Sequence, residues 1–290
     1  MASKRVLITL LTVWVITSCS NQNPGTPTIS PLDESTLQTP LPEQHESPTV
    51  PPIVLSTSEA HELVRELLEN NAGCQLPCWW GINPGETTWE KAHRILEKVS
   101  SYVGGQTQGE EFYANVNVYL PYPSDFAPYM EHLYRVKSGV VEYIRIYNYN
   151  LAPNYYLPKF LETYGRPSEI WMQSFSQEEI GQQNFAFILF YADKGILVKY
   201  GIVTPIVDVA IKEKLQVCLE GADSPFLFLW SPEKNKMSFQ DAKQKFIDTT
   251  YLPEPQPLLE ATGMDVNTFY ETFKNPDTNV CLETPKDLWP

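Results

Sequence analysis

The chain has 290 residues, with 21 Lys or Arg against 35 Asp or Glu, which gives a formal net charge of −14 and an isoelectric point near 4.7. Nucleic-acid binding draws most of its affinity from a basic face, so this balance excludes a nucleic-acid partner of the usual kind. Aromatic residues make up 12% of the chain and Pro accounts for 25 residues, so it can build a core but has a surplus of Pro to place.

The first eighteen residues have the pattern of a secretory signal peptide. Lys4 and Arg5 form a basic start, and an apolar run from Val6 to Ile16 follows. This run is shorter than the roughly 20 residues that span a bilayer core, so it is typical of a cleaved signal rather than of a permanent membrane helix. We therefore expect residues 1–18 to be removed.

A lipid attachment site follows directly. The sequence Ile-Thr-Ser-Cys, which ends at Cys19, resembles the lipobox of bacterial lipoproteins. The resemblance implies transfer of diacylglycerol to the Cys19 thiol, cleavage before Cys19, and further acylation with palmitate or a similar chain. Loss of Lys4 and Arg5 leaves 19 basic against 35 acidic residues, a net charge of −16, so lipid rather than charge would hold the protein at the membrane. The alternative is an ordinary cleaved signal in which Cys19 is incidental.

Residues 19–57 predict a tether. They contain eight prolines and many Ser and Thr, but no Lys, no Arg and no aromatic residue. Such a segment cannot bury enough apolar area to offset the entropy of ordering, so we expect a disordered linker with a reach on the order of 100 Å. Residues 58–290 remain for an extracytoplasmic domain.

The hydrophobic pattern of this domain begins as helical and then alternates. Apolar residues at helical spacing predict one helix that begins after Ser58 and a second that opens at Thr87, with Glu90 completing a capping box. Residues 112–120 then alternate apolar side chains with Tyr and Asn, the pattern of a half-buried strand. A pair of strands, 133–136 and 140–149, flanks the next turn.

The same order then starts again. A helical stripe begins at Leu157, has Pro158 in its first turn and ends at Gly165. Five strands are predicted after it, at 169–175, 185–191, 196–203, 214–219 and 226–230. Two closing helices begin at Ser238 and Asp265.

This order of elements predicts an α+β fold, in which helices pack on one face of a twisted antiparallel sheet. The two helix-then-strands series have an offset of about 70 residues and suggest a diverged duplication, with halves at 58–150 and 151–290. A doubly wound parallel sheet is not expected, because the strand-helix-strand alternation that it requires is absent.

Three short segments resemble known bacterial lipoproteins. Ile-Asn-Pro-Gly-Glu-Thr at 82–87 and Tyr-Gly-Arg-Pro at 164–167 are similar to segments of outer-membrane assembly lipoproteins of the SmpA/OmlA type and of β-lactamase-inhibitor-like domains. That resemblance implies two helices packed on a small antiparallel sheet. Residues 74–85, Cys-Gln-Leu-Pro-Cys-Trp-Trp-Gly-Ile-Asn-Pro-Gly, resemble a segment shared by bacterial lipoproteins without a known activity, which implies a family but no function.

The Cys residues predict two disulfides. With Cys19 acylated, four Cys remain in an exported chain, an even number that favours disulfide pairing. We expect Cys74 to pair with Cys78, and Cys218 with Cys281, since the last two lie in similar strand-like surroundings. A redox or metal site at Cys74 and Cys78 is the alternative, but three residues separate them instead of two and no second pair for tetrahedral zinc is nearby.

Catalytic motifs are missing. The chain has no Gly-x-Ser-x-Gly elbow, no His-Glu-x-x-His helix and no glycine-rich phosphate loop, and Gly104-Gly105 is interpreted as an isolated pair between a helix and a strand. We therefore expect no catalytic residue, no metal site and no cofactor. A glycan hydrolase that uses two dispersed carboxylates is the alternative function, because such a pair leaves no sequence signature.

Aromatic residues suggest a binding surface. Adjacent Trp residues cannot both face inward equally on a regular element, and Tyr residues gather around the Pro-rich loop 121–128. The expected surface comprises Trp79, Trp80, Tyr119, Tyr122, Tyr129 and Tyr134. Such rings suit a protein interface or sugar stacking, and their alternative role is to cover a modest core. The sequence thus predicts a lipid-anchored binding module of the bacterial cell envelope, whose partner is an envelope protein or a polysaccharide.

Overall fold

The computed structural model describes residues 55–119, 129–147, 153–206, 210–211, 213–222, 225–247 and 252–289. The described residues all belong to one unit, which spans residues 52–290. The predicted signal peptide, Cys19 and the tether as far as residue 54 lie outside the described residues. Among the helices that are described, none is both long and apolar enough to cross a membrane.

The fold is α+β, as predicted, and its main sheet has nine strands. Their order is β1-β2-β3-β4-β10-β7-β6-β5-β11, and all neighbours are antiparallel. The strands are β1 (Ser100–Gln108), β2 (Glu111–Tyr119), β3 (Tyr129–Lys137), β4 (Val140–Tyr147), β5 (Glu169–Gln177), β6 (Gln182–Tyr191), β7 (Ile196–Pro205), β10 (Pro225–Trp230) and β11 (Gln256–Pro257).

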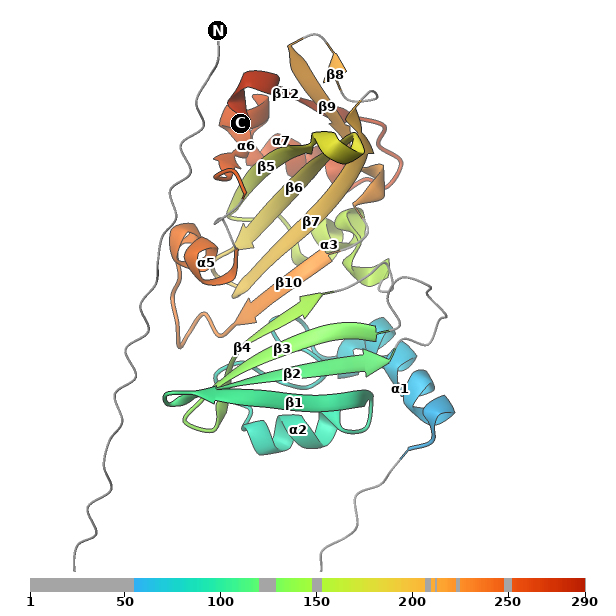
Figure 1. The fold of residues 1–290 in the computed structure, drawn as a ribbon, viewed down its shortest axis with the longest axis vertical. Helices are drawn as coiled ribbons and strands as arrows, with labels where there is room; N and C mark the ends of the chain where they lie inside the picture. The colour runs from blue at the N-terminus through green and yellow to red at the C-terminus, as the bar shows by residue number, and fades with distance from the viewer. Residues whose placement is uncertain are drawn as a thin grey trace, which may run out of the picture. The chain divides into compact units, whose positions relative to one another are not determined.

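The sheet consists of two four-stranded meanders joined at their last strands, β4 and β10, and of the short strand β11, which pairs with β5 at one edge (Figure 1). Helix α2 (Trp89–Leu96) precedes the first meander, and α3 (Leu157–Tyr164) precedes the second. The two halves therefore share one order of elements, although the second has extra strands between β7 and β10. This order fits the duplication proposed from the sequence, and common descent of the halves stays a prediction.

A smaller sheet forms from the later part of the chain. It has the order β12-β9-β8, with β8 (Ala210–Ile211), β9 (Lys214–Cys218) and β12 (Cys281–Pro285). Cys218 and Cys281 are register partners in this sheet and form a disulfide. Helices α6 (Leu258–Thr262) and α7 (Val266–Phe273) lie between β11 and β12 in the sequence.

Local capping fixes where the helices begin. Helix α1 (Thr57–Asn70) starts at a reciprocal cap between Ser56 and Glu59, two residues earlier than the sequence pattern predicted. The predicted start at Ser238 is confirmed for α5 (Phe239–Phe246), which has the same kind of cap. Helix α2 is capped by Thr88 and not by Thr87 as predicted. The Thr87 hydroxyl instead accepts a hydrogen bond from the Asn83 backbone N–H.

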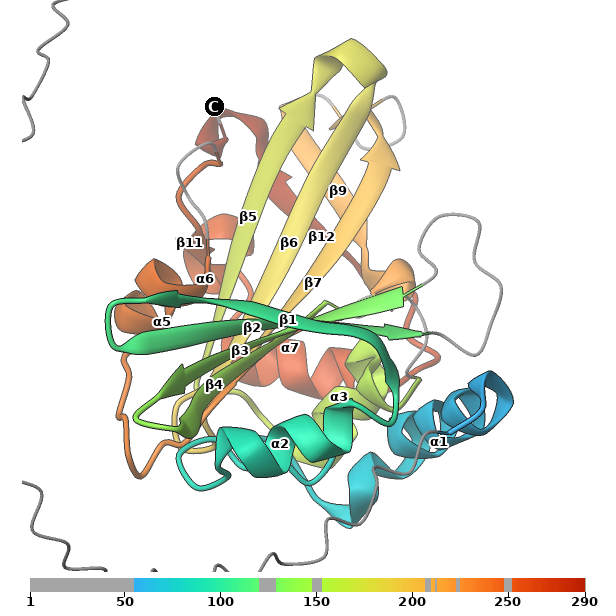
Figure 2. The ribbon, with the colours of Figure 1, turned by 60° about the horizontal axis from the view of Figure 1, so that its bottom comes forward.

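Most helices pack on one face of the main sheet, which we call the covered face. Strand β2 turns Ala114, Val116 and Val118 into the core there, together with residues of α1, α2, α3, α6 and α7. Figure 2 shows α1, α2 and α3 on one side of strands β1–β4. Helix α5 is the exception to the predicted one-sided packing, because it lies on the other face, where Phe239 stacks on Trp171 at 4.2 Å between ring centroids.

Strand β1 was not predicted, because Gly104 and Gly105 were interpreted as part of a connection. In the structure both glycines lie inside this strand. A Cβ atom at Gly104 would overlap the ring of Tyr102, and one at Gly105 would overlap the ring of Phe112. The two glycines therefore make room for neighbouring aromatic rings instead of ending the strand.

Candidate functional site

The aromatic surface predicted from the sequence is wrong for every member whose side chain is described. Trp79, Trp80 and Tyr134 are at most 1% exposed, so they belong to the core. Tyr119 and Tyr129 lie on β2 and β3, but their side chains are outside the described residues, and so is the whole of Tyr122.

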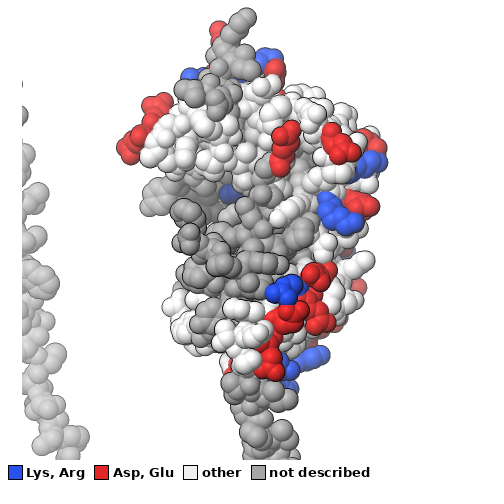
Figure 3. Space-filling view, turned by 90° about the vertical axis from the view of Figure 1, so that its right-hand side faces the viewer, with Lys and Arg blue, Asp and Glu red and all other residues white. Residues whose placement is uncertain are grey.

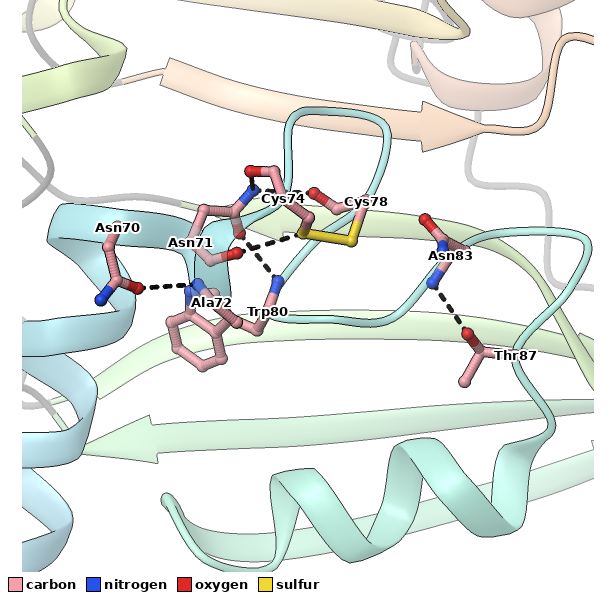
Figure 4. The surroundings of a disulfide bond; sticks show 8 residues. All are labelled: Asn70, Asn71, Ala72, Cys74, Cys78, Trp80, Asn83 and Thr87. Carbon is pink, nitrogen blue, oxygen red and sulfur yellow. Dashed lines mark hydrogen bonds between the residues drawn. A yellow bond between two sulfur atoms is a disulfide. The ribbon is translucent and has the colours of Figure 1, made fainter.

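Both Trp side chains can face inward because the segment that carries them is not a regular element. Trp80 has a φ of 54°, in the left-handed region, which turns its side chain to the same side as that of Trp79. The Asn71 amide donates to the carbonyls of Cys74 at 2.9 Å and Cys78 at 2.8 Å, and its oxygen accepts from the Trp80 N–H at 2.8 Å (Figure 4). The Asn71 side chain thus holds the loop that positions both rings.

These rings surround a buried His. The Trp79 and Trp80 centroids are 5.2 Å apart, and the His132 ring lies 4.8 Å from Trp80. His132 Nδ1 is 3.1 Å from the Tyr134 hydroxyl, and Nε2 has no hydrogen-bond partner. Burial lowers the pKa of His132 to about 3, so the imidazole is neutral. Because His132 is fully buried, this cluster serves as core.

The predicted Cys pairings are both present as disulfides, Cys74–Cys78 and Cys218–Cys281.

Over the part of the chain that the structure describes, no three His, Cys, Asp or Glu side chains gather in a way that could hold a metal ion. Four acidic residues of α1, Glu59, Glu62, Glu66 and Glu69, are exposed. Acidic side chains gather toward the lower end of the side of the molecule that Figure 3 shows.

The face opposite the covered face is the candidate site, and we call it the open face. Helix α5 covers only the region around Tyr143, Phe190, Phe228 and Trp230, and no other described helix packs there. Many described open-face residues are partly or well exposed, although Leu133 and Phe226 pack against the α5 cluster, and Gln173 and Ala186 on this face are buried. The exposed set consists of Tyr102, Tyr113, Asn115, Asn117, Glu131, Leu133, Tyr147, Asn184, Lys199, Gly201, Val203 and Phe226. Tyr102 is 57% exposed and Val203 is 58% exposed.

The strand register orders these side chains into rows. One row crosses six strands and consists of Tyr102, Asn117, Glu131, Tyr147, Phe226 and Lys199, each the register partner of the next. Neighbouring strands are about 4.8 Å apart, so this row spans about 24 Å. The Tyr147 and Phe226 rings meet edge to face at 5.2 Å. The result is a broad sheet surface of aromatic, amide and charged groups.

The two arginines at the margin of the open face both have partners within the chain. Arg135 pairs with Glu111 and lies 3.0 Å from Glu142. The hydrogen bond from Arg135 is the main reason why the pKa of Glu111 falls to about 2. A hydrogen bond from the Tyr113 hydroxyl lowers this pKa further. Arg145 donates to the Phe246 carbonyl at 3.0 Å and lies over the Phe228 ring. Glu111 and Glu142 flank one guanidinium, so they are poorly suited to act as general acid and base.

A separate cavity of about 380 Å³ lies near the first turn of α3. Its apolar wall includes Leu157, Leu219 and Phe273, and Glu162 and Glu220 are the carboxylates that line it. Glu162 is paired with Lys159 at 2.7 Å. The cavity is built from helices of the covered face, so it is not part of the open face.

No family model, curated protein or solved structure matches this chain. The candidate site therefore depends on the residues of the chain itself.

Two candidate contact residues of the open face, Lys199 and Phe226, were not predicted from the sequence. The alternation along β7 offered a signal for Lys199. Lys199 and Gly201 alternate there with three apolar or aromatic residues, Val198, Tyr200 and Ile202. Phe226 gave no such signal, since β10 is apolar at almost every position. Its partial exposure is a tertiary feature, because Phe228 and Trp230 on the same face of β10 are buried in the α5 cluster and Phe226 lies at the edge of that cluster.

Proposed function

We propose that this protein is a lipid-anchored binding module of the bacterial cell envelope, and that it contacts its partner through the open face. The observation that carries the proposal is the difference between the two faces of one sheet. On β2, Ala114, Val116 and Val118 are fully buried on one face, whereas Tyr113, Asn115 and Asn117 are partly exposed on the other. A broad face with exposed Tyr, Asn and Phe side chains is typical of an interaction surface.

The proposed location depends on the N-terminal sequence. The basic start, the short apolar run and the lipobox that ends at Cys19 support export and acylation. Two disulfides in the folded part fit an oxidising compartment outside the cytoplasm. The Pro-rich tether would let the domain reach partners at a distance from the membrane.

A protein partner suits the open face better than a polysaccharide. The longest row of side chains spans about 24 Å over a sheet, and an interface of standard size needs about 800 Å² on each partner. Glycan sites are usually clefts, whereas the open-face row runs across a sheet surface and does not enter the cavity near α3.

The anchor is tested by labelling producing cells with radioactive palmitate. The expected result is labelling of the full-length protein and its loss in Cys19→Ala, with Cys19→Ala recovered as a soluble or unprocessed chain. Cys218→Ala is the control, because it removes a Cys outside the lipobox. Label that persists in Cys19→Ala would contradict the proposed anchor.

The contact surface is tested by site-specific photo-cross-linking in intact envelopes. A benzophenone side chain is placed at Asn117 or Tyr147 on the open face, and at Glu66 of α1 or Leu259 of α6 as exposed controls. We expect discrete protein adducts from the open-face positions and none from the controls. Adducts of equal yield at all four positions, or none at the open face, would contradict the proposed surface.

A further inference from the structure

Lys199 stands out on the open face because its surroundings are uncharged. Its register partners are Phe226 on β10 and Ile188 on β6. Leu197 and Gly201 are its neighbours on the same face of β7, since side chains two residues apart along a strand share a face. A lysine side chain in this setting is half-buried among apolar groups.

The Lys199 amine has no acidic partner among the described residues. Glu131 is the carboxylate in its own row, but it lies three strands away, at about 14 Å, and accepts a hydrogen bond from Asn115 at 2.9 Å. The arginines of this face already have partners, as described above. Burial lowers the pKa of Lys199, which means that the charged amine is less stable here than in water.

Next to Lys199 there is room for a side chain from another molecule. Gly201 is paired with Ala186 on β6, and a Cβ atom added at Gly201 would meet no atom within 4 Å. Beyond Ala186 on the same face of β6, the Asn184 amide nitrogen is buried and has no hydrogen-bond acceptor. The exposed side chain of Val203 follows Gly201 on β7. Among the described residues, the Lys199 amine therefore borders a small open space with apolar neighbours, and the unpaired Asn184 donor and Gln173 Oε1 acceptor lie buried beside it.

We propose that the partner is a protein that places an Asp or Glu side chain over Gly201, where its carboxylate pairs with Lys199. Apolar residues beside that acid pack on Phe226 and Val203. Charge complementarity favours this partner, because a half-buried amine without a counter-ion gains more from an incoming carboxylate than a solvated amine does. This inference depends on the proposed function and adds the chemistry of the partner.

The proposal is tested with the full-length lipidated protein, by photo-cross-linking from Val203 in intact envelopes. Lys199→Gln is expected to lower the yield of protein adducts about tenfold or more, and Lys199→Arg to restore much of it. Gly201→Thr fills the space over Gly201 and is expected to lower the yield to a similar extent. Lys214→Gln, which removes an exposed lysine paired with Glu283 on the small sheet, is the matched control and is expected to change nothing.

Two further measurements keep the outcome interpretable. Urea unfolding of Lys199→Gln and Gly201→Thr is expected to match the parent protein within error, which separates lost binding from lost folding. Mass spectrometry of the adduct is expected to locate an Asp or Glu of the partner close to the cross-linked residue, and exchange of that acid for Lys should restore the adduct of a Lys199→Glu variant.

Adducts at Val203 that do not depend on Lys199 or Gly201, or that carry glycan in place of peptide, would overturn the inference. If Asn117 and Tyr147 still give discrete protein adducts in that case, the proposed function stands and only the acidic partner is wrong. If the open face gives none at all, both proposals fail.

Discussion

The two faces of the main sheet differ although the same strands form both. On β2, Ala114 and Val116 are fully buried under helices, whereas Tyr113, Asn115 and Asn117 are partly exposed between and beside them. Side chains alternate along a strand, so neighbouring residues belong to different environments. The covered face supplies packing and a buried polar cluster, and the open face supplies polar and aromatic groups that the fold does not need for its core. The comparison predicts that substitutions on the two faces have separable effects on stability and on binding.

The largest effect on stability is expected from His132 on the covered face, through pH. The pKa of His132 is about 3 in the folded protein and about 6.5 in an unfolded chain, so between these values the unfolded state binds one more proton. The contribution of His132 to the free energy of unfolding is therefore fully present above pH about 6.5. It is lost as the pH falls toward 3, by roughly 5 kcal/mol in all.

The measurement is urea unfolding of the parent protein and of His132→Phe between pH about 4 and 7. The slope of the free energy of unfolding against pH should show that the parent takes up about one more proton on unfolding than His132→Phe does, because Phe cannot be protonated. His93→Gln, a substitution on the partly exposed side of α2, is the control and should follow the parent. Equal slopes for the parent protein and His132→Phe would show that His132 is not held neutral by burial.

The next effect in size is expected from Trp80→Ala, which empties a fully buried site. The free energy of unfolding should fall by about 4 kcal/mol, because the cavity between Asn71, His132 and the sheet cannot be refilled easily. Chemical denaturation measures it. A loss below about 1 kcal/mol would mean that Trp80 lies at the surface, as the sequence first suggested.

A smaller loss, about 3 kcal/mol, is expected for Asn71→Ala. This change removes the amide that bonds Cys74, Cys78 and Trp80, and it puts a less suitable residue at a φ of 50°. Asn71→Gly separates the two causes, because Gly tolerates that φ and lacks only the amide.

Asn70→Ala is the matched control, since the Asn70 side chain accepts one exposed hydrogen bond from the Ala72 N–H. It should cost about 1 kcal/mol or less. Equal losses at the two positions would argue against the role of Asn71 in holding the loop.

The smallest effect is expected from the open face. Tyr102→Ser and Asn117→Ser should change the free energy of unfolding by less than about 0.5 kcal/mol, because both side chains are outside the core. The same variants should lower adduct formation in the cross-linking experiment. A loss of stability as large as that of Trp80→Ala would remove the distinction between the faces.

Much of the secondary structure could be predicted from local pattern. The stripes of α3 and α7 and the alternation of β2 were clear, because each element has one apolar side. Strand β1 was missed because Gly104 and Gly105 look like a break in the strand. Glycine is needed at these two positions because the rings of Tyr102 and Phe112 occupy the space of a Cβ atom. The Cys218–Cys281 pair was predictable from similar flanking residues, whereas the pairing of β4 with β10 has no local signature.

The candidate site was harder to predict. Trp79 and Trp80 are expected at the surface if the backbone is regular, because adjacent side chains then point in different directions. The left-handed backbone at Trp80 makes the segment irregular, so both rings can be buried. The open face itself depends on how far helix α5 extends over strands that are distant in the sequence. Sequence patterns indicate which side chains share a strand face, but not which face a later helix covers.

Radical footprinting of aromatic and aliphatic side chains tests the central claim most directly, by comparing the full-length protein in the proposed setting, the envelope of producing cells, with the purified protein. The account predicts that Tyr102, Tyr147 and Phe226 are oxidised several-fold more slowly in the envelope, whereas Ile180 and Leu259, exposed but away from the open face, are oxidised at the same rate in both. Equal oxidation of the open-face residues in both samples, or equal protection of Ile180 and Leu259, would contradict the assignment of the open face as the contact surface.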